Sequence, residues 1–93
     1  MANPANAPEM PPVEVILSEV VASLTIAAHA YLEPPAEPAT EGAGSDLDAA
    51  DIAIDVAGKA FERIQPRLQP EERAALARSL TSLRLAYVKK RGL

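Results

Sequence analysis

The 93-residue sequence contains no cysteine, no tryptophan and a single histidine. Without cysteine the chain can form no disulfide, offers no thiol nucleophile and has no thiolate metal ligand. His29 is the one side chain suited to acid and base catalysis at neutral pH. It lies on the polar strip of a predicted helix, where an imidazole is ordinarily solvated. We therefore predict no catalytic residue, and we expect that the chain is not an enzyme.

Motifs for cofactors and metals are also missing. There is no glycine-rich phosphate loop and no HExxH sequence. Asp48, Asp51 and Asp55 share one face of a predicted helix, but tight Mg²⁺ or Ca²⁺ sites need more converging oxygens, usually from a shaped loop. The sequence therefore predicts neither a metal nor a cofactor, and no small-molecule substrate.

Lysine and arginine are absent from residues 1–45, which carry six glutamates, whereas residues 46–93 carry nine basic and seven acidic side chains. A general nucleic-acid binder needs a basic face on the domain as a whole, which this distribution does not provide. The remaining candidates give only weak, strongly salt-dependent binding to phosphates. A nucleic-acid-associated accessory factor is therefore the alternative function, with possible contacts through Arg84, Lys89, Lys90 and Arg91.

Targeting signals are not expected either. Residues 1–12 have no basic segment followed by an apolar run, so they do not resemble a signal peptide, and a bacterial-type cytoplasm is the expected location. Residues 13–32 are apolar, but Glu14 and Glu19 interrupt them and neither flank offers Lys or Arg. We expect this segment not to span a membrane.

The pattern of apolar residues predicts an all-α fold. Residues 1–12 are expected to be a disordered tail, and residues 13–93 one helical domain with a flexible, Pro- and Gly-rich linker at 33–45. In residues 13–32 the apolar side chains recur at three- and four-residue steps and cover an arc of about 140°, wider than the usual stripe of a surface helix. This first helix therefore needs cover on more than one side.

Capping and proline signals divide the rest of the domain into two helices. Ser45 followed by Asp48 is a capping-box variant, which predicts that the second helix opens at Asp46. Pro66 must end it at or before Gln65, and Pro70 is favoured at the start of a third helix. Only residues 66–69 separate these two helices, so an antiparallel helical hairpin is expected.

The two later helices also resemble a known family. Bacterial members of the DUF1844 family, a domain of unknown function, typically read A-x-x-x-I-D, then N-L-T-x-E-E, then a leucine-spaced helix ending L-R-x-x-Y-V. The resemblance spans about residues 13–90 and implies a small bacterial helical protein, without implying any activity. The chain differs from the family in the K-T-x-G-N-L-T turn, where it has a proline turn in place of the glycine turn. The matching positions include Ala50, Ile54, Asp55, Leu68, Glu71, Glu72, Leu83, Arg84, Tyr87 and Val88.

These patterns lead to one reading of architecture and function. A domain of this size has a small core and commonly gains stability by oligomerising, so we expect a three-helix unit that forms a homodimer or binds a protein partner. The linker is long enough for the first helix to pack on its own chain or on a neighbour's. The predicted function is a non-enzymatic protein–protein interaction or oligomerisation module, with core and interface residues Ile16, Val20, Leu24, Tyr31, Ile54, Phe61, Leu76, Leu80, Leu83 and Tyr87.

Overall fold

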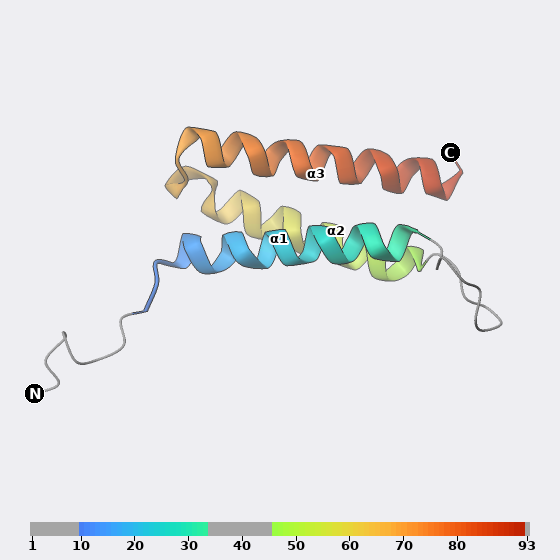
Figure 1. The fold of residues 1–93 in the computed structure, drawn as a ribbon, viewed down its shortest axis with the longest axis horizontal. Helices are drawn as coiled ribbons and strands as arrows, with labels where there is room; N and C mark the ends of the chain where they lie inside the picture. Colours follow the sequence, from blue (N-terminus) through green and yellow to red (C-terminus); the bar gives the residue numbers. More distant parts are fainter. Residues whose placement is uncertain (1–9, 34–45, 93) are drawn as a thin grey trace, which may run out of the picture.

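The computed structural model describes residues 10–33 and 46–92. They form three α-helices and one short 3₁₀ turn: α1 (Val13–Leu32), α2 (Leu47–Ile64), η1 (Gln65–Arg67) and α3 (Pro70–Arg91). These residues contain no strand, so the prediction of an all-α fold is confirmed. Residues 1–9 of the predicted tail and 34–45 of the predicted linker lie outside the described residues. Figure 1 shows α1 and α2 together, with α3 lying along one side of the pair.

The second helix begins one residue later than predicted. Asp46 is its N-cap rather than its first residue, and the Asp46 Oδ1 accepts a hydrogen bond from the Ala49 N–H at 2.9 Å. A carboxylate there satisfies a backbone N–H group of the first turn that has no partner within the helix. The prediction that Ser45 caps a helix starting at Asp46 was wrong on the helix start, and Ser45 itself lies outside the described residues.

Between α2 and α3 the chain turns through η1. Pro66 lies in η1, and the preceding helix ends at Ile64, as a proline without an N–H group requires. The Arg73 Nη1 donates a hydrogen bond to the Gln65 carbonyl at 3.2 Å and so ties the first turns of α3 to the end of α2. Gly92 ends α3 with a φ of 83°, a left-handed conformation that favours glycine. Figure 1 shows α3 returning from this turn along the other helices.

Bonds at both ends fix α1 against α2. At one end the Arg67 Nε lies 2.9 Å from the Glu14 Oε1, and at the other the Asp46 N–H donates to the Tyr31 carbonyl at 2.8 Å. Between these ends α2 packs more extensively against α1 than against α3. Small side chains allow this close approach of the two helix backbones, because the buried residues between them include Ala28, Ala50, Ala53 and Ala57.

The core consists of two clusters along the three helices. One contains Ala28, Leu32, Ala50, Ala53, Ile54 and Leu83, and the other contains Val21, Ala57 and Leu80. Leu80 and Leu83 are the two α3 side chains that complete these clusters, at 2% and 0% exposure. The part of the core contributed by α3 therefore rests on a few leucines, whereas α1 and α2 meet along an alanine-rich contact.

The buried residues of α1 lie at one edge of the predicted apolar arc, which includes Val21 and Ala28. Its fully buried residues are Val21, Ala28 and Leu32, which lie about 70° around the helix from the centre of the predicted apolar face, at 100° per residue. Ile16, Val20 and Leu24 are only half-buried, and Tyr31 is 40% exposed. The apolar arc of α1 is wider than the surface that α2 and α3 cover, so one edge of it is left partly open.

Candidate functional site

A groove between α1 and α2 collects much of this uncovered apolar surface. It has a volume of about 260 Å³ and is lined by Leu24, Ala27 and Tyr31 from α1 and by Ala49, Ile52 and Ala53 from α2. Helical periodicity continues this surface along both helices to four further apolar residues. We call the whole set the groove face: Ile16, Val20, Leu24, Ala27, Tyr31, Ala49, Ile52, Ala53, Val56 and Ala60.

The groove face points away from α3. Gly58 lies against the Arg84 side chain of α3, and Val56 precedes Gly58 by two residues, so the two point in roughly opposite directions, about 200° apart. Ile52 and Ile54 are related in the same way, and Ile54 is buried in the cluster that includes Leu83. Val56 and Ile52 are therefore 45% and 57% exposed on the side that no described part of the chain covers.

Further apolar side chains of α1 are exposed outside the groove face. Ile26 is 71% and Val15 45% exposed, and neither is covered by a described residue. Among the described residues α1 is the one helix that is long and apolar enough to cross a membrane, a test that the core helix of a soluble protein also passes. Much of α1 is thus apolar surface in the single chain.

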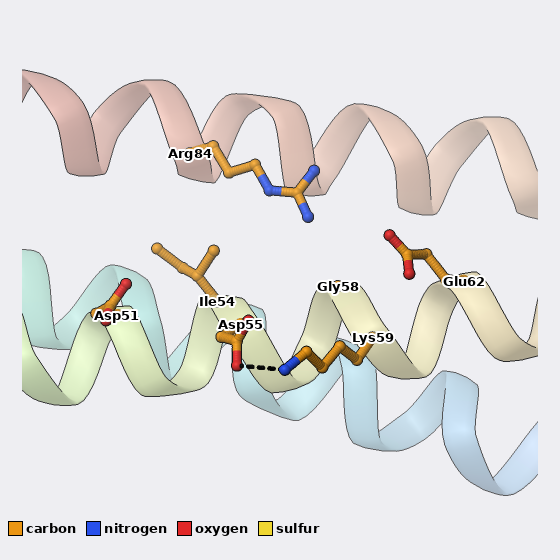
Figure 2. A pocket seen from close by; sticks show the side chains of 7 residues that line it. All are labelled: Asp51, Ile54, Asp55, Gly58, Lys59, Glu62 and Arg84. Atoms are coloured by element: carbon orange, nitrogen blue, oxygen red, sulfur yellow. Dashed lines mark ion pairs between the residues drawn. The ribbon is translucent and has the colours of Figure 1, made fainter.

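A second hollow, of about 250 Å³, lies between α2 and α3. Six of its lining residues come from α2, and Arg84 reaches into it from α3 (Figure 2). Ile54 and Asp55 from the A-x-x-x-I-D segment thus meet Arg84 from the L-R-x-x-Y-V segment. The lining comprises Asp51, Ile54, Asp55, Gly58, Lys59, Glu62 and Arg84.

The charges around this hollow are mainly acidic. Asp51, Asp55 and Glu62 line the same hollow as Arg84, and Lys59 pairs with Asp55 at 3.2 Å (Figure 2). Within the described part of the chain Arg84 forms no ion pair of its own, but three carboxylates set the local field that it experiences. This setting opposes the approach of a phosphate, so Arg84 is poorly placed for the nucleic-acid contact considered from the sequence.

The remaining basic candidates do not extend one surface with Arg84. Lys89, Lys90 and Arg91 are consecutive and exposed, so they point in directions about 100° apart. The Arg91 guanidinium carbon lies 5.5 Å from the centre of the Tyr87 ring, in range of a cation–π contact. The last turn of α3 therefore offers scattered charges rather than a basic face.

Polar chemistry is sparse elsewhere among the described residues. His29 is exposed on α1, and no group of three acidic, histidine or cysteine residues within 10–33 and 46–92 is placed to hold a metal ion. The aspartates Asp48, Asp51 and Asp55 lie exposed along α2. The groove face differs from these polar groups in being an apolar surface to which two helices contribute side chains.

Gly58 is a residue whose role the sequence reading missed. It is buried in the middle of α2, and a Cβ built there would lie 2.5 Å from the Arg84 Nη2. Glycine inside a helix normally lowers stability, so its presence there is the signal that could have indicated a close neighbour. At this position it leaves room for the Arg84 side chain to lie across α2.

We predict that Gly58→Ala stabilises the protein by about 0.5–1 kcal/mol, because alanine is the better helix former. The new methyl group would meet only the far end of a flexible arginine, which can move aside. Urea unfolding followed by circular dichroism measures the change in the free energy of unfolding. A loss of stability would mean that Arg84 is held rigidly over α2, and the double variant Gly58→Ala with Arg84→Ala would then recover it.

Comparison with known proteins agrees with the motifs. The family model "Domain of unknown function (DUF1844)" matches residues 14–89, which include all three α-helices except for one terminal residue of α1 and the last two of α3. No curated protein and no solved structure matches the chain. The predicted resemblance is confirmed, and the chain belongs to the DUF1844 family.

Proposed function

We propose that this protein is a non-enzymatic protein–protein interaction module of the cytoplasm that binds its partner through the groove face. The observation that supports the proposal is the exposure of Ile52, Val56 and Tyr31, at 57%, 45% and 40%, beside half-buried apolar residues of α1. In this proposal α2 and α3 form an antiparallel hairpin that holds α2 in place, while α1 and α2 present the binding surface.

The amount of uncovered apolar surface favours binding over a purely structural role. Single exposed leucines or valines are common on proteins, whereas contiguous apolar patches of several hundred Å² mark interaction sites. The ten residues of the groove face carry no charge, and the two most exposed aliphatic ones, Ile52 and Val56, lie one turn apart on α2. Covering a side chain of this kind contributes about 25 cal/mol for each Å² of apolar surface removed from water, which offsets the entropy lost on association.

The proposal is tested with a matched pair of variants. Ile52→Glu places a charge in the groove face, and Leu85→Glu places one on α3 at a side chain that is 62% exposed. Because both side chains are exposed in the single chain, both variants should keep the helical content of the parent. The parent and both variants are immobilised and used to capture proteins from the native cell, with identification of everything bound, including further copies of this chain.

We expect the parent and Leu85→Glu to retain one protein in a stoichiometric ratio, and Ile52→Glu to lose it. Because the contact is apolar, retention should persist at about 0.5 M salt, where exposed charge pairs are largely screened. Equal capture by both variants would contradict the proposal. Capture of nucleic acid that disappears at raised salt would favour the accessory-factor alternative instead.

A further inference from the structure

We infer that the partner covering the groove face is a second copy of this chain, packed about a two-fold axis parallel to the helices. In this arrangement α1 of each copy lies on α2 of the other, so that four helices enclose the two groove faces. The inference rests on the proposed function and adds to it the identity of the partner and the register of the complex. Its support comes from two charged residues at the edge of the groove face, Glu19 and Arg63.

The fixed ends of the α1 and α2 pair place these two residues at nearly the same height. Glu14 is level with Arg67 and Tyr31 with Asp46, because bonds join each pair. Counting inward along the antiparallel helices from either end puts Glu19 level with residues 58–62, about 1.5–7.5 Å along the helix from Arg63. The height of Glu19 along the molecule thus matches that of Arg63.

Both side chains also border the groove face. Arg63 follows Val56 by seven residues, so the two lie only about 20° apart around α2, with Arg63 towards the end of the helix. Glu19 precedes Val20 by one residue, which places it about 100° around α1, on the outer side. Both residues are exposed, and within the described residues neither forms an ion pair. Lys59, the other basic residue at this height, is paired with Asp55.

A two-fold axis parallel to the helices turns this arrangement into two matching contacts. It keeps both copies pointing the same way, so residues at one height in one copy meet residues at that height in the other. Glu19 at the edge of one α1 then faces Arg63 of the α2 lying over it, and symmetry repeats the contact on the other side. Opposite charges flanking an apolar seam are the arrangement by which paired helices select partner and register.

The size of the surface also suits a dimer. Two helices about 30 Å long and each about 10 Å wide present roughly 600 Å² per copy. Stable interfaces bury about 600–1,000 Å² on each partner, so the groove face reaches the lower end of that range. Its alanines, Ala27, Ala49, Ala53 and Ala60, allow the helices of the second copy to approach closely.

A two-fold axis perpendicular to the helices would give a different set of contacts. It would lay α1 on α1 and α2 on α2 in opposite directions, and Glu19 would then face the middle of the other α1, a segment without a basic residue. Arg63 would lie near Asp48 of the other copy. In the parallel arrangement Glu19 and Arg63 both lie opposite a partner of opposite charge, so we favour that arrangement.

Charge reversal tests the inference with full-length protein. In Glu19→Arg and in Arg63→Glu, each dimer would contain two contacts between like charges, and we expect its Kd to rise by about tenfold or more. An equimolar mixture of the two variants restores attraction at both contacts, because one contact keeps Glu19 opposite Arg63 and the other has the two charges exchanged. The mixture should therefore form a heterodimer with nearly the Kd of the parent. Arg78→Glu, on the exposed surface of α3, is the control with the same change of net charge as Arg63→Glu and should leave the Kd unchanged.

Sedimentation equilibrium at several concentrations, with one variant carrying a fluorescent label, measures these constants. A parent that dimerises while the mixture gains nothing over either variant would contradict the contact between Glu19 and Arg63. If the parent is monomeric but captures another protein, and Ile52→Glu abolishes that capture, the dimer is contradicted and the proposed function still holds. A monomeric parent that instead binds phosphatidylcholine vesicles through its apolar helix would contradict both.

Discussion

Replacing Leu83 by aspartate is expected to unfold the protein. Leu83 is fully buried, and it joins α3 to the cluster that contains Ala28, Leu32 and Ala50. Removing a buried leucine alone costs about 2–5 kcal/mol, and a buried carboxylate without a partner adds several more. Small domains are stable by only about 5–15 kcal/mol, so the substitution should remove most or all of the stability.

The measurement is far-ultraviolet circular dichroism of Leu83→Asp during heating, beside Leu85→Asp as its matched control. Leu85 lies two residues further along α3, points in the opposite direction and is 62% exposed. The control should therefore lose no more than about 1 kcal/mol, mainly through the poorer helix propensity of aspartate. A cooperative, fully helical Leu83→Asp protein would show that α3 does not pack through this face.

The behaviour of α2 and α3 shows how much a sequence pattern can predict. Leucines spaced by three and four residues placed Leu80 and Leu83 towards the interior. Ala50, Ile54, Ala57, Phe61 and Ile64, which follow the same steps along α2, are buried or half-buried. Prolines and capping residues gave the helix ends to within one residue. These features are local, because each depends on the periodicity of one helix or on the backbone requirements of one residue type.

The burial of α1 could not be predicted in the same way. Its apolar residues extend so far around the helix that periodicity alone does not choose which edge meets α2. The choice depends on the alanines of α2, which allow Val21 and Ala28 to be fully buried while Tyr31 remains partly exposed. The hollow beneath Arg84 was missed for a related reason: it needs Gly58 on one helix and an arginine on another, and no single segment shows both.

The residues of the family motifs and the apolar groove face lie on different sides of α2. The two segments that carry the resemblance meet at the hollow between α2 and α3, which Asp51, Asp55, Glu62 and Arg84 help to line. The apolar groove face lies on the opposite side of α2. The charged hollow and the groove face are thus separated across one helix, so substitutions at one should leave the other unchanged.

Replacing Ala57 by leucine is expected to destabilise the protein, whereas replacing its neighbour Gly58 by alanine is not. Ala57 is fully buried, in the cluster where Val21 of α1 and Leu80 of α3 meet α2. Extra methylene groups in a filled core cost about 1–3 kcal/mol, and here the obstacle includes the closely approaching α1 rather than the end of a flexible side chain. Ala57→Leu should therefore lower the free energy of unfolding by that amount, which corresponds to a fall in Tm of about 4–20 °C for a domain of this size.

Ala75→Leu on α3 is the control, because Ala75 is exposed and its enlargement meets nothing buried. Leucine and alanine are both good helix formers, so the control should stay within about 0.5 kcal/mol of the parent. Urea unfolding of the parent, both leucine variants and Gly58→Ala measures all four free energies under one condition. An Ala57→Leu protein as stable as the control would mean that α1 can move away from α2 at no cost. A helix pair held rigidly by the bonds at Glu14 and Tyr31 has no room for a leucine side chain at its closest contact. That result would therefore show that these bonds contribute little to holding α1 against α2.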